Sequence, residues 1–227
     1  MKTIIERVSG IVLLVVAIWL FGGCDEKFLN NTEQIVGSGT LTTRTVSTPE
    51  FSGIVLTGIG EVYVTQDSVQ SVRIEADDNI IDRLQLDVHS GKLNVGIQQG
   101  SYSHVTIKIY ISMKSVESLE LTGAGNFATV GPIDAATLSC TISGAGNMTL
   151  TGRAVQEIVA LQGAGSIHGF DLESARCSVM LSGTGSAEVN VTQHLDATVS
   201  GVGSVIYAGN PPEVIGHVSG VGSIHRK

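Results

Sequence analysis

Apolar and polar residues alternate with period two along most of the chain, and a Gly-x-Gly phrase flanked by polar residues recurs within this pattern. An apolar residue stands two positions before the first glycine of each phrase, and another stands four positions after it. The residues two positions before are Leu56, Leu121, Ile142, Leu161, Leu181, Val199 and Val218, and those four positions after are Val62, Phe127, Met148, Ile167, Ala187, Val205 and Ile224. Because successive side chains of a strand point to opposite faces, each phrase is predicted to join two strands that each bury one face.

The phrase occurs seven times, and from the second copy onward its first glycines lie 21, 19, 20, 18 and 19 residues apart. A period of this size indicates one supersecondary unit stacked on copies of itself. Each glycine pair is predicted to form a sharp corner, because glycine tolerates positive φ and close backbone contact. The predicted corner glycines are Gly58, Gly60, Gly123, Gly125, Gly144, Gly146, Gly163, Gly165, Gly183, Gly185, Gly201, Gly203, Gly220 and Gly222.

Residues around the corners should also stack from one unit to the next. The residue between the glycines is mostly small and apolar, so we expect it to point into the corner of a narrow core. Ser166, Ser186, Ser204 and Ser223 occupy one position of the repeat. We expect these serines to form a ladder whose hydroxyls satisfy one another without a ligand.

The pattern predicts an all-β protein with a parallel β-helix as its single domain. An antiparallel β-sandwich is the alternative, because turn signals every 8–12 residues also fit it. The β-helix is favoured because the copies match in register on both sides of the corner. Residues 116–227 are predicted to form the regular repeats, and residues 37–115 are predicted to form irregular coils or a strand-rich insertion over the N-terminal end.

The N-terminal segment has the character of a targeting signal. Lys2 and Arg7 precede eleven apolar residues, 11–21, which are too few to span a membrane and suit a signal-peptide core. The sequence Phe-Gly-Gly-Cys ending at Cys24 resembles the lipobox of bacterial lipoproteins, which implies cleavage before Cys24 and lipidation of its thiol. An ordinary cleaved signal and an uncleaved anchor are the alternatives. We therefore expect a signal peptide over 1–23, a tether over 24–36 and a domain over 37–227.

The net charge and the cysteine spacing bear on possible partners and on disulfide formation. The formal net charge is −8 and no basic stripe is visible, so nucleic acid is not an expected partner. Cys140 and Cys177 would lie two coils apart, about 10 Å by the strand spacing. That separation exceeds the reach of a disulfide. We predict two free thiols that behave as small core residues.

A family resemblance rests on three stretches: residues 51–62, residues 72–82 with the sequence VRIEADDNIID, and the later Gly-x-Gly-Asn/Ser copies. They resemble the head GIN domain family, which is described as auto-transporter adhesins and is common in lipoproteins of Bacteroidota-type bacteria. The resemblance covers the chain from about Val36 onward and implies a right-handed parallel β-helix. The family has no established activity, so the resemblance carries over no functional residues.

Two groups of side chains raise the question of metal binding. Glu75, Asp77, Asp78 and Asp82 could hold Ca²⁺ through their oxygens. The favoured interpretation is that Asp77 or Asp78 caps a single helical turn. His168 and His225 occupy equivalent positions that face outward, three coils and about 14 Å apart by stacking, too far to share a metal. We predict no metal or cofactor site.

Candidate catalytic and ligand-binding residues are sparse. Asp171 and Glu173 share one side of a strand, a weak carboxylate pair for an enzyme acting on polysaccharides. No Ser-His-Asp arrangement is apparent, so no catalytic residue is predicted. Tyr102, in a predicted loop tip, is the best single candidate for stacking on a ligand, ahead of Tyr63, Tyr110 and Tyr207.

These observations favour a lipoprotein of the cell envelope, anchored in the outer membrane, that acts as a non-enzymatic adhesion or binding scaffold for a glycan or protein ligand at the cell surface. A polysaccharide-processing enzyme on the same scaffold is the alternative. His225, Arg226 and Lys227 would guard the edge of the last coil. We therefore expect a monomer or a side-packed homo-oligomer.

Overall fold

The computed structural model describes residues 34–227. The predicted signal peptide, Cys24 and most of the predicted tether lie outside the described residues. A compact unit spans Ile35–Lys227. Residues 34–227 contain no candidate membrane-spanning helix.

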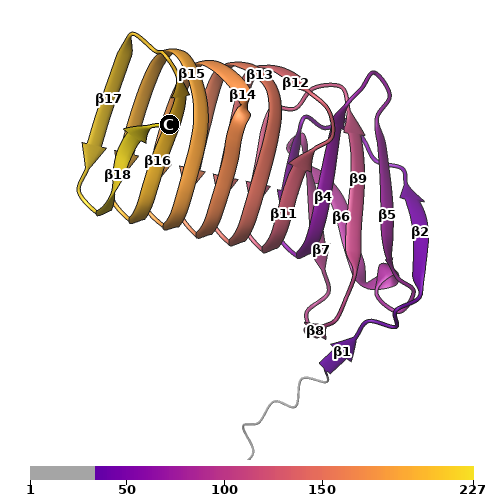
Figure 1. The fold of residues 1–227 in the computed structure, drawn as a ribbon. Coiled ribbons are helices and arrows are strands. Elements are labelled where there is room, and N and C mark those ends of the chain that lie inside the picture. The colour runs from indigo at the N-terminus through magenta and orange to yellow at the C-terminus, as the bar shows by residue number, and fades with distance from the viewer. Residues whose placement is uncertain (1–33) are drawn as a thin grey trace, which may run out of the picture. The chain divides into compact units, whose positions relative to one another are not determined.

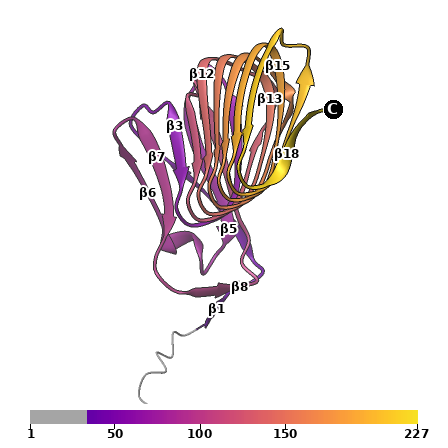
Figure 2. The same ribbon diagram turned by 90° about the vertical axis from the view of Figure 1, so that its left-hand side faces the viewer.

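This unit is built around a β-solenoid of stacked parallel coils, which confirms the predicted β-helix over the antiparallel sandwich (Figure 1). In each coil, one strand leads into a Gly-x-Gly corner and another leaves it. The corners follow one another along one edge of the stack, and Figure 2 shows the coils nested behind each other. Equivalent residues of consecutive coils pair in parallel, so each strand is hydrogen-bonded to its own counterparts.

The coils form two facing sheets. The incoming sheet contains the strands that lead into corners: β3 (Gly53–Leu56), β10 (Ser118–Leu121), β12 (Ile133–Ile142) and β17 (Glu213–Val218). The outgoing sheet contains the strands that leave corners: β4 (Ile59–Gln66), β11 (Ala124–Thr129), β16 (Val202–Gly209) and β18 (Val221–Arg226). Three long strands bend from one corner to the next and join both sheets: β13 (Ala145–Leu161), β14 (Ala164–Leu181) and β15 (Thr184–Val199).

The core lies between the two sheets and consists of the predicted apolar columns. Leu161 lies directly alongside Leu181, and Ile167 alongside Ala187, and all four side chains are buried. Cys140 also faces this interior, next to Val159. The alternation of apolar and polar residues therefore positions the side chains as the sequence predicts.

The corner glycines are required by close backbone approach. A Cβ on Gly144 would lie 1.9 Å from the carbonyl oxygen of Gly123 on the preceding coil, and one on Gly146 would lie 1.6 Å from that of Gly125. Gly146 also has a φ of 145°, in the range that favours glycine. Each corner can therefore stack on the previous one only because both positions lack a side chain.

The residue between the glycines is exposed in six of the seven phrases, so the prediction that it points into the core was wrong for these; only Ile59, in the first phrase, packs against the core. Ala145 is exposed, and the exposed fractions of Val202 and Val221 are 53% and 72%. The alternation continues through the corner, so the two glycines take the inward positions and the middle residue faces solvent.

The N-terminal end carries the predicted strand-rich insertion, but part of it enters the stack out of chain order. β7 (Lys92–Ile97) pairs in parallel with β3, and β9 (Ile107–Met113) pairs in parallel with β4. β10 and β11 pair with the opposite edges of β3 and β4. Residues 92–113 therefore form a coil on the N-terminal side of the first corner in the stack, although these residues follow that corner in the sequence.

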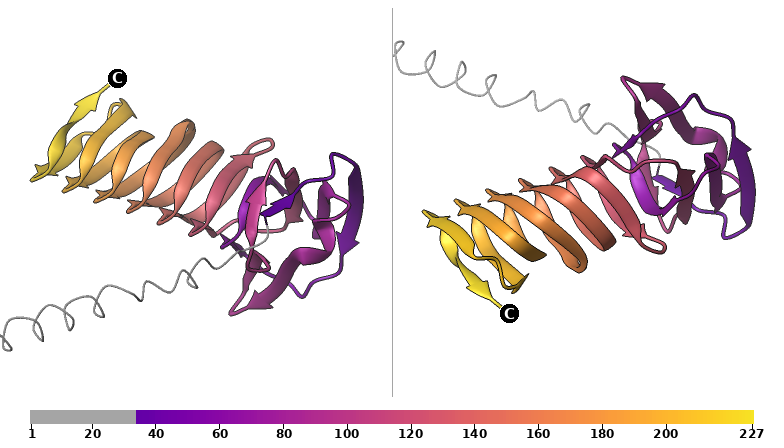
Figure 3. Two further views of the ribbon diagram at one scale, coloured as in Figure 1. Left: turned by 90° about the horizontal axis from the view of Figure 1, so that it is seen from below. Right: turned by 90° about the horizontal axis from the view of Figure 1, so that it is seen from above.

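Antiparallel strands complete this end of the stack. β5 (Ser71–Asp77) pairs with β9, β2 (Leu41–Val46) pairs with β5, and β6 (Leu84–His89) pairs with β7. Two views at right angles to Figure 1 show that the regular coils are evenly spaced and that these strands gather at the N-terminal end (Figure 3).

The insertion also contains two short elements. The 3₁₀ helix η1 (Ile81–Arg83) connects β5 to β6. β8 (Ser101–Ser103) lies in the segment between β7 and β9, where the other coils have a Gly-x-Gly corner, and pairs with β1 (Gln34–Val36). The last residues of the expected tether thus form a strand.

Candidate functional site

The outward face of the outgoing sheet carries two parallel columns of side chains. The polar column, three positions after the first glycine of each phrase, contains Glu61, Asn126, Asn147, Ser166, Ser186, Ser204 and Ser223. The mixed column, two positions further along each strand, contains Tyr63, Ala128, Thr149, His168, Glu188, Ile206 and His225. Because strand side chains alternate, both columns point away from the core.

The polar column is held by hydrogen bonds between successive coils. Asn147 Nδ2 donates to Asn126 Oδ1 over 3.2 Å, and the Ser166 backbone N donates to Asn147 Oδ1 over 3.0 Å. Ser186 Oγ donates to Ser166 Oγ over 3.1 Å, and the hydroxyls of Ser204 and Ser223 lie 3.0 Å apart. The predicted serine ladder is present as two hydroxyl pairs, Ser166 with Ser186 and Ser204 with Ser223, and two asparagines that the prediction did not include extend the column.

The mixed column begins with stacked aromatic rings at the N-terminal end. Tyr63 on β4 stacks on Tyr110 on β9, with ring centres 5.2 Å apart and an interplanar angle of 16°. The guanidinium carbon of Arg73 on β5 lies 3.9 Å from the centre of the Tyr110 ring. The Tyr63 hydroxyl donates to Glu61 Oε2 over 2.9 Å, and this hydrogen bond raises the pKa of Tyr63. Three strands thus contribute to one rigid cation–aromatic stack.

On the other side of Tyr63, the mixed column contains only the methyl group of Ala128, and a depression of about 260 Å³ opens there. Because neighbouring strands are about 4.8 Å apart, Tyr63 and Thr149 stand roughly 10 Å from each other across Ala128. We call this depression the Tyr63 slot. Its lining residues are Glu61, Val62, Tyr63, Asn126, Phe127, Ala128, Asn147, Thr149 and His168.

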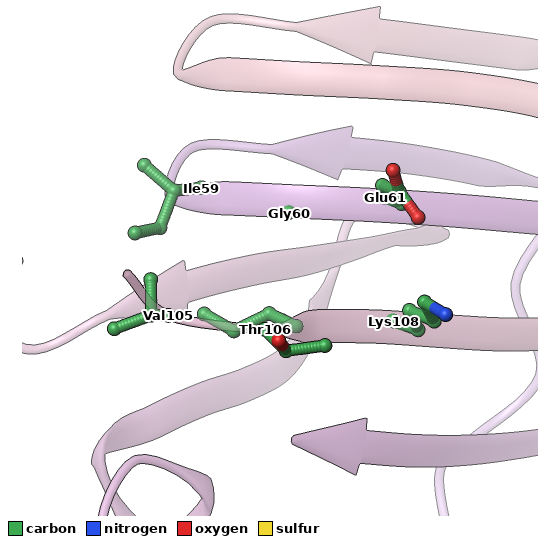
Figure 4. A pocket seen from close by; sticks show the side chains of 7 residues that line it. Ile59, Gly60, Glu61, Val105, Thr106 and Lys108 are labelled. Carbon is green, nitrogen blue, oxygen red and sulfur yellow. The ribbon is translucent and has the colours of Figure 1, made fainter. Parts of the chain in front are cut away.

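A second depression, of about 450 Å³, adjoins Glu61 from the N-terminal side. It lies between β4 and the start of β9 and is lined by Ile59, Gly60, Glu61, Val105, Thr106, Ile107 and Lys108. Figure 4 shows Glu61 opposite Lys108, with Ile59 and Val105 nearer the corner. Glu61 therefore stands between two hollows, one of them made by the out-of-order coil.

Tyr102, the ligand candidate from the sequence, is half-buried. Its ring packs against the core, and its hydroxyl donates to the Gln98 carbonyl over 2.6 Å. Tyr207 is also half-buried against the core. A binding role for Tyr102 stays a prediction, whereas Tyr63, also half-buried, lines a surface depression.

The acidic cluster of the sequence is divided among separate structural roles. Asp77 is buried and accepts hydrogen bonds from the backbone N of Gly39 and Thr106, at 2.8 and 2.7 Å. Asp78 accepts from Ser38 Oγ, and Asp82 pairs with Arg44 at 3.1 Å.

The expected helical turn is present as η1, but the expectation that Asp77 or Asp78 caps it was wrong. Ile80 is at the N-cap, without a side-chain cap. The Asp77 side chain instead fixes two loops of the insertion. Among the described residues, no group of three or more His, Cys, Asp or Glu side chains could hold a metal.

The remaining candidates are dispersed on the surface. His168 pairs with Glu188 at 3.1 Å, and His225 contacts Ser223. The two histidines lie three coils apart in the mixed column. Asp171 and Glu173 are exposed. Glu173 lines a third depression, of about 530 Å³, with Gln66, Pro132, Ile133, Asp134, Gly152 and Arg153. In the described part of the chain, neither Asp171 nor Glu173 has a hydrogen-bonded or ionic partner that would set it up for proton transfer.

The sequence reasoning missed a buried carboxylate in the core. Glu157 on β13 lies between Leu138 and Cys177 of the neighbouring coils and has no exposed surface. Neither carboxylate oxygen has a well-formed hydrogen bond. Burial raises the pKa of Glu157 to about 7, although nearby Ser174 and Cys177 act to lower it. The signal was visible in the sequence, because Glu157 occupies a repeat position otherwise taken by residues such as Leu138 and Leu195.

Cys140 and Cys177 are both free and buried, as predicted. Burial, and secondarily Glu157, raises the pKa of each thiol well above its usual value. At neutral pH both thiols are therefore protonated core groups.

Comparison with known proteins places this architecture in context. The family model described as "Putative auto-transporter adhesin, head GIN domain" matches residues 50–211. A crystal structure described as a putative adhesin from Bacteroides fragilis is 23% identical, covers 85% of this chain and 100% of its own, and has a TM-score of 0.68. One described as a putative lipid binding protein from Parabacteroides distasonis is 21% identical, covers 86% and 100%, and has a TM-score of 0.52. These similarities show a shared fold. No curated protein matches the sequence.

Proposed function

Because the chain belongs to the head GIN domain family, described as "Putative auto-transporter adhesin", we propose that it is a cell-envelope lipoprotein whose solenoid serves as a non-enzymatic adhesion module. The family, as described, suggests a protein of the cell surface or envelope. We further propose a lipid anchor and a binding surface for this module.

The proposed anchor is the lipidated thiol of Cys24, in the outer membrane. The apolar segment 11–21 and the two small residues before Cys24 support it. Two or more acyl chains hold a protein stably on a bilayer, whereas a single chain binds only marginally. The expected tether then leads into the compact unit at Ile35.

One observation carries the adhesion proposal: the outgoing sheet presents a continuous, outward-facing array of hydrogen-bonding side chains on a rigid support. Asn126, Asn147 and Ser166 are fixed from coil to coil by the ladder. Such pre-organised groups lower the entropy cost of binding an extended partner. Glycosidases use two neighbouring carboxylates. The carboxylates of the two columns, Glu61 and Glu188, lie four coils apart, which supports binding over turnover. Its ligand would be a glycan or protein at the cell surface.

We also propose that the protein works as a monomer or a side-packed oligomer. The last coil exposes Val214, Ile215 and Val218 on β17, but it also carries His225 and Arg226 on β18. Basic side chains at a strand edge discourage further strand addition.

The test uses a soluble protein of residues 25–227, which retains every described residue. Its binding to a glycan array and to surface proteins would be measured beside an activity screen on acidic polysaccharides. Specific binding without cleavage is the expected result. Polysaccharide cleavage would overturn the proposal in favour of an enzyme.

A further inference from the structure

We infer that the Tyr63 slot is a binding subsite for one neutral pyranose ring of a glycan, an inference that rests on the proposed adhesion function. The argument uses the open face of the Tyr63 ring, the polar groups beside it and the size of the slot.

The first step is the open aromatic face. Tyr110 covers one face of the Tyr63 ring, with the ring centres 5.2 Å apart. The next residue in the mixed column, Ala128, is too small to cover the other face. Arg73, Tyr110 and the hydrogen bond to Glu61 hold the ring in place. An aromatic face that is fixed and uncovered offers a stacking surface without the entropy cost of ordering a mobile side chain.

The second step is the set of polar groups along the edge of that face. Glu61 Oε2 accepts from the Tyr63 hydroxyl, so Oε1 remains to accept hydrogen bonds from a ligand. Asn126 Oδ1 accepts from the backbone N and from Nδ2 of Asn147, at 3.0 and 3.2 Å. These two bonds orient the amide and leave Asn126 Nδ2 to donate. Thr149, on the opposite wall, adds a hydroxyl.

The third step matches this chemistry to a ligand. A pyranose presents C–H groups on its face and hydroxyls around its edge, so it can stack on Tyr63 while its hydroxyls meet Glu61 and Asn126. The slot of about 260 Å³ is smaller than the roughly 300–1,000 Å³ of pockets for drug-sized ligands, which suits a single ring. Glu61 is the one carboxylate among the residues that line the slot, and none of them is a lysine or an arginine, so the slot favours a neutral ring over a uronic acid.

The test combines array binding with three variants of the 25–227 protein. Ala128→Tyr fills the slot and extends the aromatic stack, which tends to stabilise neighbouring strands. Tyr63→Ala removes the stacking face. Val155→Tyr is the matched control, since it adds the same side chain at an exposed position of β13 outside both columns. The array carries neutral oligosaccharides of glucose, galactose, mannose and N-acetylglucosamine beside oligogalacturonides, and calorimetry then gives affinities for the best neutral binder.

The expected result is binding of a neutral oligosaccharide that weakens by about 10-fold or more in Ala128→Tyr and Tyr63→Ala. Val155→Tyr should bind as the unmodified protein does, and Ala128→Tyr should keep the circular dichroism and thermal midpoint of the unmodified protein. Undiminished neutral-glycan binding by a folded Ala128→Tyr variant would overturn the inference, as would binding of oligogalacturonides alone. If the protein attaches to surface proteins but binds no glycan, the slot inference fails while the adhesion proposal stands. If it binds neither, both fail.

Discussion

Gly144 stacks so closely on Gly123 that a Cβ at position 144 would lie 1.9 Å from the Gly123 carbonyl oxygen. Both residues belong to corners that repeat along the stack, so the same close contact recurs from coil to coil. The period of the solenoid therefore depends on the absence of a side chain at this position.

Replacing Gly144 by Ala should lower the free energy of unfolding by about 3 kcal/mol or more, because the added methyl group must push two coils apart. Urea unfolding would measure the change. Ala145→Ser is the control, since residue 145 faces solvent and should stay within about 0.5 kcal/mol of the unmodified protein. Equal unfolding midpoints for Gly144→Ala and the control would contradict the stacking explanation.

The buried Glu157 makes stability depend on pH. Its pKa is about 7 in the folded protein and near 4.5 when unfolded, so the folded state binds the proton more tightly. The contribution of Glu157 to the free energy of unfolding is constant below pH 4.5. The free energy of unfolding falls as the pH rises from 4.5 towards 7, and the loss is complete above pH 7. The total cost is about 3 kcal/mol.

Glu157→Leu should therefore stabilise the protein at about pH 8.5 and have less effect at about pH 5, because leucine continues the column formed by Leu138 and Leu195. Urea unfolding at both pH values would measure this difference. The exposed Glu173→Leu variant serves as control and should keep the pH dependence of the unmodified protein. The same pH dependence in Glu157→Leu would show that this carboxylate is not responsible.

Cys140 and Cys177 should be unreactive in the folded protein, because burial both blocks access and raises the thiol pKa. In the 25–227 protein they are the only two cysteines. Iodoacetamide labelling followed by mass spectrometry should find no modified thiol in buffer and two in urea. Rapid labelling in buffer would contradict the buried positions.

Cys24→Ser should abolish acylation if Cys24 carries the lipid. Cells that express the unmodified protein should retain it in the membrane fraction and incorporate labelled palmitate into it. The variant should incorporate none, and Cys140→Ser, which keeps Cys24, should behave as the unmodified protein. Palmitate incorporation into Cys24→Ser would refute the proposed anchor.

The regular coils could be predicted because two independent periods agree. Strand alternation assigns each residue to the inside or the outside, and the repeat of about 20 residues aligns equivalent positions. Together they correctly place Leu161 beside Leu181. The same parity places Ala164 outside, since Leu161 and Gly163 take inward positions. The expectation for the corner residues was wrong because it relied on their small apolar side chains and not on the strand alternation.

The order of the coils could not be predicted in this way. Residues 92–113 contain no Gly-x-Gly phrase, and their place beside β3 and β4 results from pairing between strands distant in sequence. The Tyr63 slot depends on the same pairing between strands that are distant in sequence. Alignment of the repeats shows that Ala128 follows Tyr63 in its column, but the ring of Tyr110 comes from the displaced coil.

Because of the displaced coil, residues 92–113, the two ends of the solenoid are expected to assemble differently. Beyond Ser118, each new coil has a finished neighbour to grow on, so deletions from the C-terminus should shorten the rod by whole steps. At the other end, one edge of β4 stays unpaired until β9 has been synthesised, because the strand that covers it comes later in the chain. The first corner of this molecule therefore gains its neighbour on the N-terminal side of the stack only after residues 107–113 have been made.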